Sequence, residues 1–484
     1  MNTGNFEPSM FLAILPEMGL VLLAGLILFL DLLWKGKDLR RLGYITAIGL
    51  TILAVLGLFF SLPSAKPVLI FGSMLRLDWM SFVFRMIFFF GAAVTALFIL
   101  DEPGESRTGE FYALLITSTL GMSLMASSAN LVMLYLAIEL TSIPLYILTG
   151  FKVKNEKSVE SGIKYFLYGA MTSAVMLYGF SLVYGFSGSA NLYEIASNLQ
   201  KGNLPAILLS LSAGLVMVGF GFKVSTVPFH FWAPDVYEGA PTAVAGFLST
   251  ASKAAGFAVL LRFMLAVFPS IQMEWTLIIA ILATASMILG NILALAQKNI
   301  KRLLAYSSIA QAGYILVGVA ADSPLGATGT IFYLTSYLVT NLAAFAIISY
   351  VGQRVGSDDL EAFAGLNRKN PTLALAMLIA VLSLGGIPPL SGFVGKLLVF
   401  AAAVQAGQIW LAFVGVITSI VGLYYYLVIL KTIYARESAH EVQALPLNPA
   451  WKTALILCVA GIILLGTVFG PVYTWTNLAG SGLF

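Results

Sequence analysis

Long apolar stretches separated by short polar segments run along almost the whole chain. A bilayer core about 30 Å thick needs roughly 20 apolar helical residues to cross it, so each long stretch is a candidate membrane span. Lipid offers the backbone no hydrogen-bond partners, so runs of this kind form helices, and the alternating pattern of barrel strands is absent. The pattern therefore predicts an all-α polytopic membrane protein. The 14 predicted spans are 10–33, 42–62, 80–100, 110–128, 130–150, 161–186, 204–233, 241–266, 274–296, 301–320, 325–351, 371–406, 408–431 and 451–470.

Basic residues between the predicted spans gather on one side of the membrane. The loops reached after the first span carry most of the lysines and arginines, whereas the opposite loops carry only Lys66, Arg76 and Lys201. Loops rich in lysine and arginine stay in the cytoplasm. We therefore expect the first set of loops to be cytoplasmic and both chain termini to face outward.

Two predicted spans, 204–233 and 371–406, are too long for one crossing and contain helix-breaking residues. Proline lacks a backbone donor and clashes with the preceding turn, so we expect the first segment to break at Pro228 and Pro234. The second segment carries the sequence GGIPP at 385–389. Both segments are predicted to be broken helices.

A lysine lies close to each predicted break, Lys223 beside the first and Lys396 beside the second. Interrupted helices at corresponding positions of two halves point to a transport site built from repeats. If residues 110–266 form one five-helix unit and residues 274–431 the next, the broken segment is the fourth in each. An odd number of spans per unit makes the two repeats inverted. The remaining predicted regions are an N-terminal group of three helices at 1–100 and a C-terminal helix at 451–484.

The composition favours a membrane over water as the main solvent. Of the 484 residues, 59% are hydrophobic and only 10% are charged, against roughly 25% charged in a soluble domain. Cys458 is the single cysteine, so no internal disulfide or cysteine-based metal site can form. No haem-attachment, iron–sulfur, Walker or dinucleotide-binding motif is present, so we expect no cofactor and no metal in this chain. The first apolar run, 11–34, contains Glu17 and is too long for a cleavable signal, so it is a retained span.

Two ionisable residues are predicted to lie deep in the membrane, where a charge is costly and usually functional. Glu139 is near the middle of its span, and Lys253 is equally central and flanked by Ser249, Thr250 and Ser252. A static ion pair between Glu139 and a lysine is one reading, although such pairs rarely stabilise a protein more than apolar packing does. The other reading is a proton relay, in which a carboxylate that approaches or leaves a lysine changes that lysine's affinity for a proton.

Further charged and polar residues lie near the ends of the predicted spans. Arg85 and Arg262 are close to the outer ends of theirs, so we expect both side chains to snorkel to the interface. Lys164 has Glu160 one turn earlier, at a spacing that favours an ion pair, and it fits a structural pair and a role in proton transfer equally well. The tyrosine run 424–426 is interpreted as packing.

The polar residues after the first break also leave two readings open. His230 lies within two turns of Lys223, where it could hand over protons or satisfy the broken backbone. Asp235 and Glu238 come just before the next span. Because acids complement the positive N-terminus of a helix, we expect these two residues to act as helix caps.

Four motifs carry a resemblance to a known family. They are VPFHFWAPDVYEGAPT at 227–242, KYFLYGAMTSAVMLYG at 164–179, NIKRLLAYSSIAQAGY at 299–314 and GGIPPLSGFVGK at 385–396. In this order they resemble the antiporter-like membrane subunits of respiratory complex I. The resemblance covers essentially the whole chain.

The resemblance implies a 14-helix subunit in which two inverted five-helix repeats each form a proton half-channel around a broken helix. Glu139 would be the modulating acid and Lys223 its paired lysine. Lys253 would be the central lysine, and Lys396 the lysine of the second broken helix. A related subunit type of the same family has a glutamate where this chain has Lys396.

The resemblance also implies partners and a location. FMN, iron–sulfur clusters and quinone would belong to partner subunits, so that NADH is oxidised elsewhere while this chain moves protons. The partners would be the other membrane and peripheral subunits, in the bacterial inner membrane. An alternative is a subunit of a multi-subunit cation/proton antiporter, and a different class altogether is a scaffold subunit that does not pump.

Overall fold

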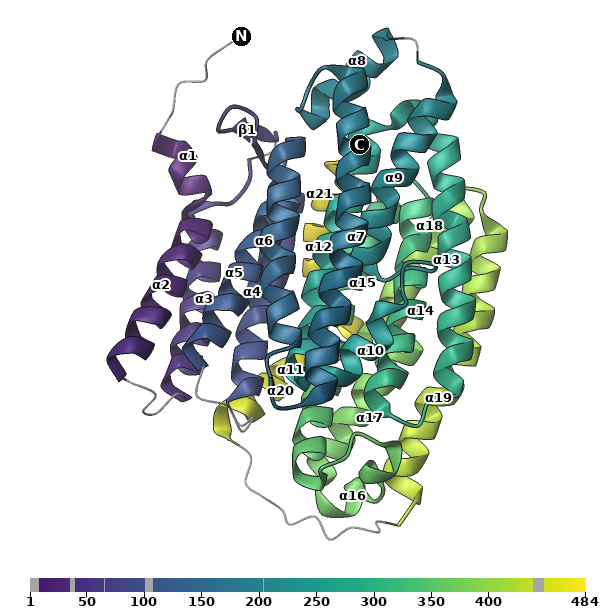
Figure 1. Cartoon of the computed structure of the whole chain (residues 1–484). Helices are drawn as coiled ribbons and strands as arrows, with labels where there is room; N and C mark the ends of the chain where they lie inside the picture. The colour runs from purple at the N-terminus through teal and green to yellow at the C-terminus, as the bar shows by residue number, and fades with distance from the viewer. Residues whose placement is uncertain (1–7, 35–39, 65, 101–107, 203, 438–447) are drawn as a thin grey trace.

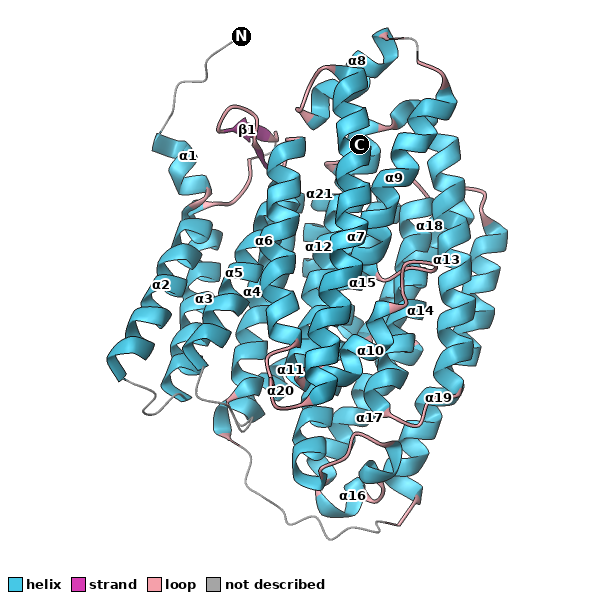
Figure 2. Ribbon diagram, viewed as in Figure 1, coloured by secondary structure: helices cyan, strands magenta, loops and turns pink. Residues whose placement is uncertain are grey.

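The computed structural model describes residues 8–34, 40–64, 66–100, 108–202, 204–437 and 448–484. Most of the described chain is helical, and the long helices run side by side (Figures 1 and 2). The all-α prediction is confirmed, apart from one short antiparallel hairpin. The elements are α1 (Pro8–Ala13), α2 (Leu15–Trp34), α3 (Arg40–Phe60), β1 (Val68–Ile70), β2 (Leu75–Leu77), α4 (Trp79–Ile99), α5 (Thr108–Ser127), α6 (Leu131–Thr149), α7 (Glu156–Ser187), α8 (Leu192–Lys201), α9 (Ala206–Val224), α10 (Trp232–Gly239), α11 (Thr242–Phe247), the π-helical turn η1 (Leu248–Ser252), α12 (Lys253–Val267), η2 (Pro269–Ile271), α13 (Gln272–Leu295), α14 (Ile300–Ala320), α15 (Pro324–Val355), η3 (Leu360–Phe363), α16 (Leu366–Lys369), α17 (Pro371–Gly385), α18 (Ser391–Gln405), α19 (Ile409–Ala435), α20 (Pro449–Thr467) and α21 (Gly470–Ser481).

Twelve helical segments of the described chain are long and apolar enough to cross a membrane. Each coincides with one of the predicted spans. Helix α5 occupies a further predicted span without belonging to the twelve, and the predicted span 371–406 divides into α17 and α18, with 15 residues each. The structure therefore supports a multi-pass membrane protein, and the count of 14 spans stays a prediction.

The centre of the bundle consists of the continuous segment from α11 to α12 together with α14 and α15. Nearly every side chain of these helices is buried by other helices. Helices α2 and α3 lie at one edge of the bundle (purple in Figure 1) and leave many apolar side chains exposed. Polar side chains on the central helices are therefore shielded within protein and have to find their partners there.

Both predicted interruptions are present. Helix α9 ends at Val224, and the chain turns through Ser225, which has a left-handed φ of 60°, before α10 begins at Trp232. Helix α17 ends in the same way before Gly386, which has a φ of 82°. The predicted break at Pro234 is wrong. Pro234 lies in the first turn of α10, where proline is tolerated because its missing amide hydrogen would have no intrahelical partner anyway.

The two arginines expected to snorkel are instead buried. Arg262 is 2% exposed and donates hydrogen bonds of 2.7 and 2.9 Å to the carboxylate of Asp78. Arg85 is also 2% exposed, and its Nε donates to Glu17 at 2.8 Å, which in turn accepts a hydrogen bond from Ser123. The snorkelling prediction is wrong because an acid from a distant part of the chain meets each arginine inside the bundle.

Removing the Arg262 side chain should destabilise the bundle. Breaking a buried ion pair by deleting one partner costs about 3–5 kcal/mol, because a charge is left behind in a poorly solvated place. We expect Arg262→Ala to lower the temperature at which the detergent-solubilised protein precipitates. The control is Arg436→Ala, whose exposed pair with Glu361 contributes little. Equal precipitation temperatures for the two variants would contradict this account.

Candidate functional site

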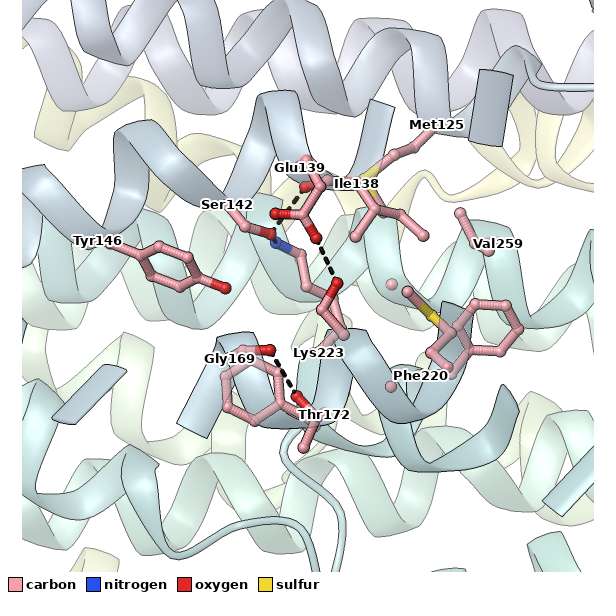
Figure 3. Close-up of a pocket in the computed structure, with 15 residues that line it drawn as sticks. Met125, Ile138, Glu139, Ser142, Tyr146, Gly169, Thr172, Phe220, Lys223 and Val259 are labelled. Carbon is pink, nitrogen blue, oxygen red and sulfur yellow. Dashed lines mark hydrogen bonds between the residues drawn. The ribbon is translucent and has the colours of Figure 1, made fainter. Parts of the chain in front are cut away.

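The first predicted acid and lysine lie beside a small cavity among α6, α7, α9 and α12 (Figure 3). Lys223 is 6% exposed, and its Nζ donates to Ser142 Oγ at 3.0 Å. Glu139, one turn before Ser142 on α6, accepts a hydrogen bond from Ser173 of α7. Among the described residues no direct ion pair joins Glu139 to Lys223, so the static-pair reading has no support. Both groups line the cavity, and its volume of about 20 Å³ is large enough for a water molecule.

The end of α9 holds Lys223 at a defined depth. Lys223 is the penultimate residue of the helix, and the interruption that follows leaves backbone groups without intrahelical partners. Side chains satisfy some of them, since Trp232 Nε1 donates to the carbonyl of Phe222 at 3.2 Å and the amide of Val227 donates to Ser286 Oγ at 3.0 Å. These hydrogen bonds order the chain at the break, so the end of α9 that carries Lys223 is held in a fixed position.

Lys253 lies in the centre of the bundle and is 1% exposed. Its Nζ donates to the main-chain carbonyl of Ser308 at 2.8 Å and also to the Ser308 hydroxyl. Lys253 directly follows the π-helical turn η1, which the sequence did not reveal, and such turns occur frequently at functional sites. Within η1, Ser249 accepts a hydrogen bond of 2.6 Å from Asn341. Every hydrogen-bond partner of the Lys253 ammonium group among the described residues is neutral.

Polar side chains lead from the Lys253 site toward the second interruption. Ser308 follows Ser307 on α14, and the Ser307 hydroxyl lies 2.5 Å from the hydroxyl of Tyr426 on α19. Gln311, one turn further along α14, donates to Tyr426 at 3.1 Å and to the carbonyl of Leu384 in α17 at 3.0 Å. Three helices are thus joined by hydrogen bonds at the place where α17 ends.

The tyrosine run interpreted as packing divides into three different environments. Tyr424 is 65% exposed, whereas Tyr425 and Tyr426 are buried. Tyr425 donates to Asn291 at 3.0 Å. The packing interpretation therefore misses Tyr426, whose hydroxyl belongs to the polar chain.

Lys396 lies on α18 and points back at the end of α17. It is 7% exposed, its Nζ is 3.3 Å from the carbonyl oxygen of Gly385, and it sits 4.6 Å from the centre of the Tyr314 ring. The carbonyl end of a helix and the face of an aromatic ring both favour a cation. Gly386 is required twice here, because its φ is left-handed and a Cβ would lie 2.9 Å from Lys396 Cδ.

His230 lies inside the first interruption and is 5% exposed. A hydrogen bond to the main-chain carbonyl of Pro228 holds its ring, and the ring stacks on Phe231. Its Nδ1 has no hydrogen-bond partner among the described residues. This arrangement favours the reading in which His230 satisfies the broken backbone, and no hydrogen bond brings it to Lys223.

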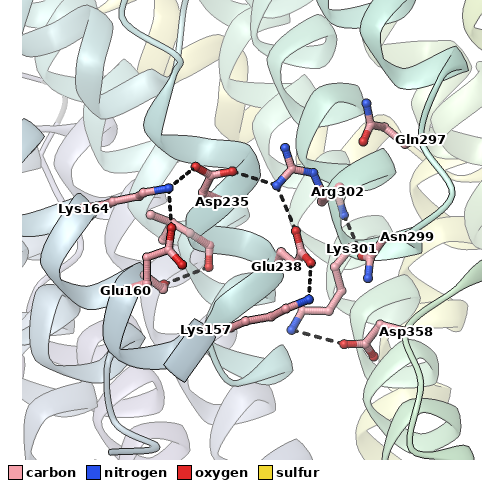
Figure 4. Close-up of polar contacts among 12 residues, drawn as sticks. Lys157, Glu160, Lys164, Asp235, Glu238, Gln297, Asn299, Lys301, Arg302 and Asp358 are labelled. Atoms are coloured by element: carbon pink, nitrogen blue, oxygen red, sulfur yellow. Dashed lines mark hydrogen bonds and ion pairs between the residues drawn. The ribbon is translucent and has the colours of Figure 1, made fainter. Parts of the chain in front are cut away.

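Asp235 and Glu238, on α10, form an ion cluster with basic residues of two other helices (Figure 4). Arg302 of α14 donates to both acids, at 2.7 and 2.8 Å. Lys164 and Lys157 of α7 pair with Asp235 at 2.6 Å and with Glu238 at 2.7 Å. The helix after the first interruption is thereby held between α7 and α14.

The capping prediction for the two acids is wrong, since no side chain caps α10 or α11. Burial alone would raise the pKa of Asp235, but hydrogen bonds from Lys164 and Arg302 outweigh it and keep that pKa below its ordinary value. The same balance, with Lys157 and Arg302 as donors, lowers the pKa of Glu238. The pair of Lys164 with Glu160, at 2.6 Å, is confirmed. At neutral pH the acids and bases of the cluster are therefore ionised, which suits a structural role in holding α10 to α7 and α14.

Sequence reasoning missed the neutral partners of the lysines. Ser142 could have been found, because it is three residues after Glu139 and so shares its helix face. Ser308 and Tyr426 gave no such signal, since their contacts with Lys253 and with Ser307 bridge 55 and 119 residues of sequence.

Known proteins share both the sequence and this architecture. The family described as NADH:quinone oxidoreductase/Mrp antiporter, TM matches residues 128–422. The NADH-quinone oxidoreductase subunit N of Chlorobium chlorochromatii (strain CaD3) is 40% identical over 472 residues, which cover 94% of this chain and 91% of that protein.

Solved structures agree with the sequence comparison. A chain of respiratory complex I from Thermus thermophilus is 36% identical with a TM-score of 0.80, covering 95% of this chain and 98% of its own. A chain of the Mrp complex from Dietzia sp. DQ12-45-1b has a TM-score of 0.86 and covers 98% and 97%, but at 21% identity it shows the fold alone. The chain therefore belongs to the family of NADH:quinone oxidoreductase and Mrp antiporter membrane subunits.

Proposed function

We propose that this chain is a proton-translocating membrane subunit, of the N type, of a respiratory NADH:quinone oxidoreductase. The observation that carries the proposal is the set of three buried lysines whose ammonium groups meet neutral oxygen atoms, with hydroxyl and amide side chains lying between the sites of Lys253 and Lys396. A charge buried in a membrane protein is usually functional. Groups joined by hydroxyl and amide side chains are arranged to pass protons.

The relay begins at Glu139 and Lys223. Movement of the Glu139 carboxylate toward Lys223 or away from it changes the affinity of the lysine for its proton, and Ser142 accepts a hydrogen bond from Lys223 beside that carboxylate. Lys223 packs against Gly256, one turn beyond Lys253 on α12, where a Cβ would come within 3.0 Å of Lys223 Cγ. Lys253 is therefore the next proton acceptor along the bundle.

The second part of the relay runs from Lys253 to Lys396. Ser308 and Ser307 carry the path to Tyr426 and Gln311, and Gln311 reaches the end of α17 where Lys396 lies. The lysine of the second broken helix is thus the last of the three. His230 and Lys164 stay outside this path and act on the structure of α10.

Two inverted five-helix repeats, 110–266 and 274–431, form the two proton half-channels. Each contains one interrupted helix in fourth position, α9 with α10 in the first and α17 with α18 in the second. Residues 1–100 supply three further membrane-spanning helices, α2, α3 and α4, and residues 451–484 supply the last span. Together they make 14 spans. These are the twelve long apolar helical segments, helix α5, and the segment that divides into α17 and α18.

The chain lies in the bacterial inner membrane with both termini on the periplasmic side, as the basic loops indicate. Helix α1 and the C-terminus lie at the same end of the bundle in Figure 1, which agrees with an even number of crossings. FMN, iron–sulfur clusters and quinone belong to the partner subunits. Among the described residues no group of three or more metal-binding side chains gathers.

Neighbouring membrane subunits cover part of α6 and α7. Glu139 is only partly buried in the isolated chain, and the surface beside it carries Leu136 and Ile143, which are 58% and 52% exposed. A carboxylate at mid-membrane depth has to be shielded from lipid. Contact with a partner subunit would complete this site.

A subunit of a multi-subunit cation/proton antiporter is the second candidate function. The likeness to the Mrp complex structure favours it at the level of the fold. The NADH-quinone oxidoreductase relatives, with about twice the sequence identity, favour the redox-driven pump. Copurification from native membranes separates the two, because flavin and iron–sulfur subunits accompany only the redox complex.

Removing either end of the first pair should stop coupled activity. We expect Glu139→Ala and Lys223→Ala to lower NADH-driven proton uptake into membrane vesicles by at least about tenfold, because each deletes a proton-transfer group. Acidification is followed with a fluorescent dye, and native gels check that the complex assembles. Lys201→Ala, at an exposed position of α8, is the control.

Normal pumping and turnover in both variants would refute the relay. Pumping that persists after all four residues Glu139, Lys223, Lys253 and Lys396 are removed would support the scaffold reading. Sodium or potassium transport without quinone chemistry would establish the antiporter instead.

Tyr426 should carry a measurable part of the transfer between Lys253 and Lys396. Tyr426→Phe keeps the buried ring but removes the hydroxyl that contacts Ser307 and Gln311. Loss of a buried hydrogen-bonding group worth about 1 kcal/mol corresponds to a reduction of about fivefold in pumping rate. Tyr424→Phe, at an exposed ring, is the matched control. Equal rates in the two variants would place Tyr426 outside the path.

A further inference from the structure

Asp322 is a carboxylate that the relay above does not use. It lies between α14 and α15, at the opposite end of α14 from the Arg302 cluster, and it has a left-handed φ of 42°. Its Oδ2 accepts a hydrogen bond from Gln272 of α13, whereas its buried Oδ1 has no hydrogen-bond partner among the described residues. Capping does not explain Asp322, because Ser323 caps α15 by accepting from the amide of Gly326.

Asp322 lines a small cavity at the end of the bundle where Phe484 lies. Apolar side chains such as Met264 of α12 and Trp275 of α13 line it too, together with Gly318 of α14. Its volume is about 10 Å³, close to the minimum that a water molecule needs. The distribution of basic residues assigns this end of the bundle to the outer side of the membrane.

One face of α14 connects this cavity to the lysines. Ser308, Gln311 and Gly318 are spaced by three and seven residues, so they share a helix face, and Tyr314, under the Lys396 ammonium group, lies at its border. Asp322 follows about 12 Å beyond Tyr314 along the axis. At Gly318 a Cβ would meet the Thr330 hydroxyl of α15 at 2.5 Å. A hydroxyl group therefore stands between the Tyr314 level and the Asp322 cavity.

We propose that Asp322 is the proton-release group on the outer side of this chain. A proton leaving the Lys396 ammonium group passes the Tyr314 and Thr330 level, binds the Asp322 carboxylate, and then dissociates into the outer aqueous phase. This inference rests on the proposed function and adds the group through which protons leave the relay on the outer side.

The surroundings of Asp322 suit a group that releases protons near neutral pH. Burial raises the pKa of Asp322 to about 6. The groups around it are the neutral Gln272 from α13, apolar side chains from α12, Ser323 at the start of α15, and Phe484. Arg262 on α12 is held by Asp78. When the aqueous phase on the outer side of the membrane is above about pH 6, the Asp322 carboxyl group releases its proton. Below about pH 6 the carboxyl group stays protonated.

The test uses the whole complex in liposomes, with the NADH-binding arm outside and the internal pH set during reconstitution. We expect wild-type proton accumulation to fall as the internal pH is lowered from about 7.5 to about 5.5. Asp322→Asn should reduce accumulation at least about threefold at the higher pH and abolish the dependence on internal pH. Asparagine still accepts the Gln272 hydrogen bond, so a merely structural role would survive this change. Asp322→Glu should restore both rate and pH dependence, and Glu274→Gln, at an exposed acid of α13, is the control.

Wild-type rates and wild-type pH dependence in Asp322→Asn would overturn the release role. That result can be told apart from failure of the proposed function by including Glu139→Ala in the same series. If Glu139→Ala abolishes pumping while Asp322→Asn does not, only the release role fails. If both variants pump normally, the relay itself is wrong.

Discussion

The arrangement of this chain depends on how each buried cation is satisfied inside an apolar bundle. A cation removed from water is costly unless a protein group takes over its solvation. The two buried arginines are answered by carboxylates, with Asp78 beside Arg262 and Glu17 beside Arg85. Among the described residues, three of the four buried lysines, Lys223, Lys253 and Lys396, are answered by hydroxyl and carbonyl oxygens, whereas the fourth, Lys301, lies 3.6 Å from the carboxylate of Asp358. In the arginine pairs the two charges neutralise each other and hold helices together. Lys223, Lys253 and Lys396 have no such carboxylate partner, so binding or loss of a proton changes the charge at each of these three sites.

That distinction explains which parts of the site the sequence could predict. Depth within a span was enough to select Glu139 and Lys253, because a mid-span position leaves no route to the interface. Proline and glycine positions were enough to locate both interruptions, although Pro234 proved harmless in the first turn of a helix. Snorkelling failed for Arg85 and Arg262 because their acids come from 68 and 184 residues away. A local pattern carries no information about partners at that separation.

The capping error has the same origin. Asp235 and Glu238 stand where acids often cap a helix, but Arg302 lies 67 and 64 residues further along the chain and binds both. The sequence also gave no sign of the π-helical turn before Lys253, because its residues are ordinary helix and serine positions. Tertiary contacts decide these features, and they connect helices that the sequence keeps far apart.

Helix α14 is the element that joins these contacts. Its first turn holds α10 through Arg302, its middle binds Lys253 through Ser308 and Tyr426 through Ser307, and Gln311 reaches α17. The interrupted helices on either side are short and depend on such contacts for their position. A small displacement of α14 along its axis would therefore change the hydrogen bonding of Lys253 and the end of α17 together. A single helix that contacts both interruptions offers a mechanical reason for the two half-channels to act in step, because neither break can shift without altering the polar face of α14.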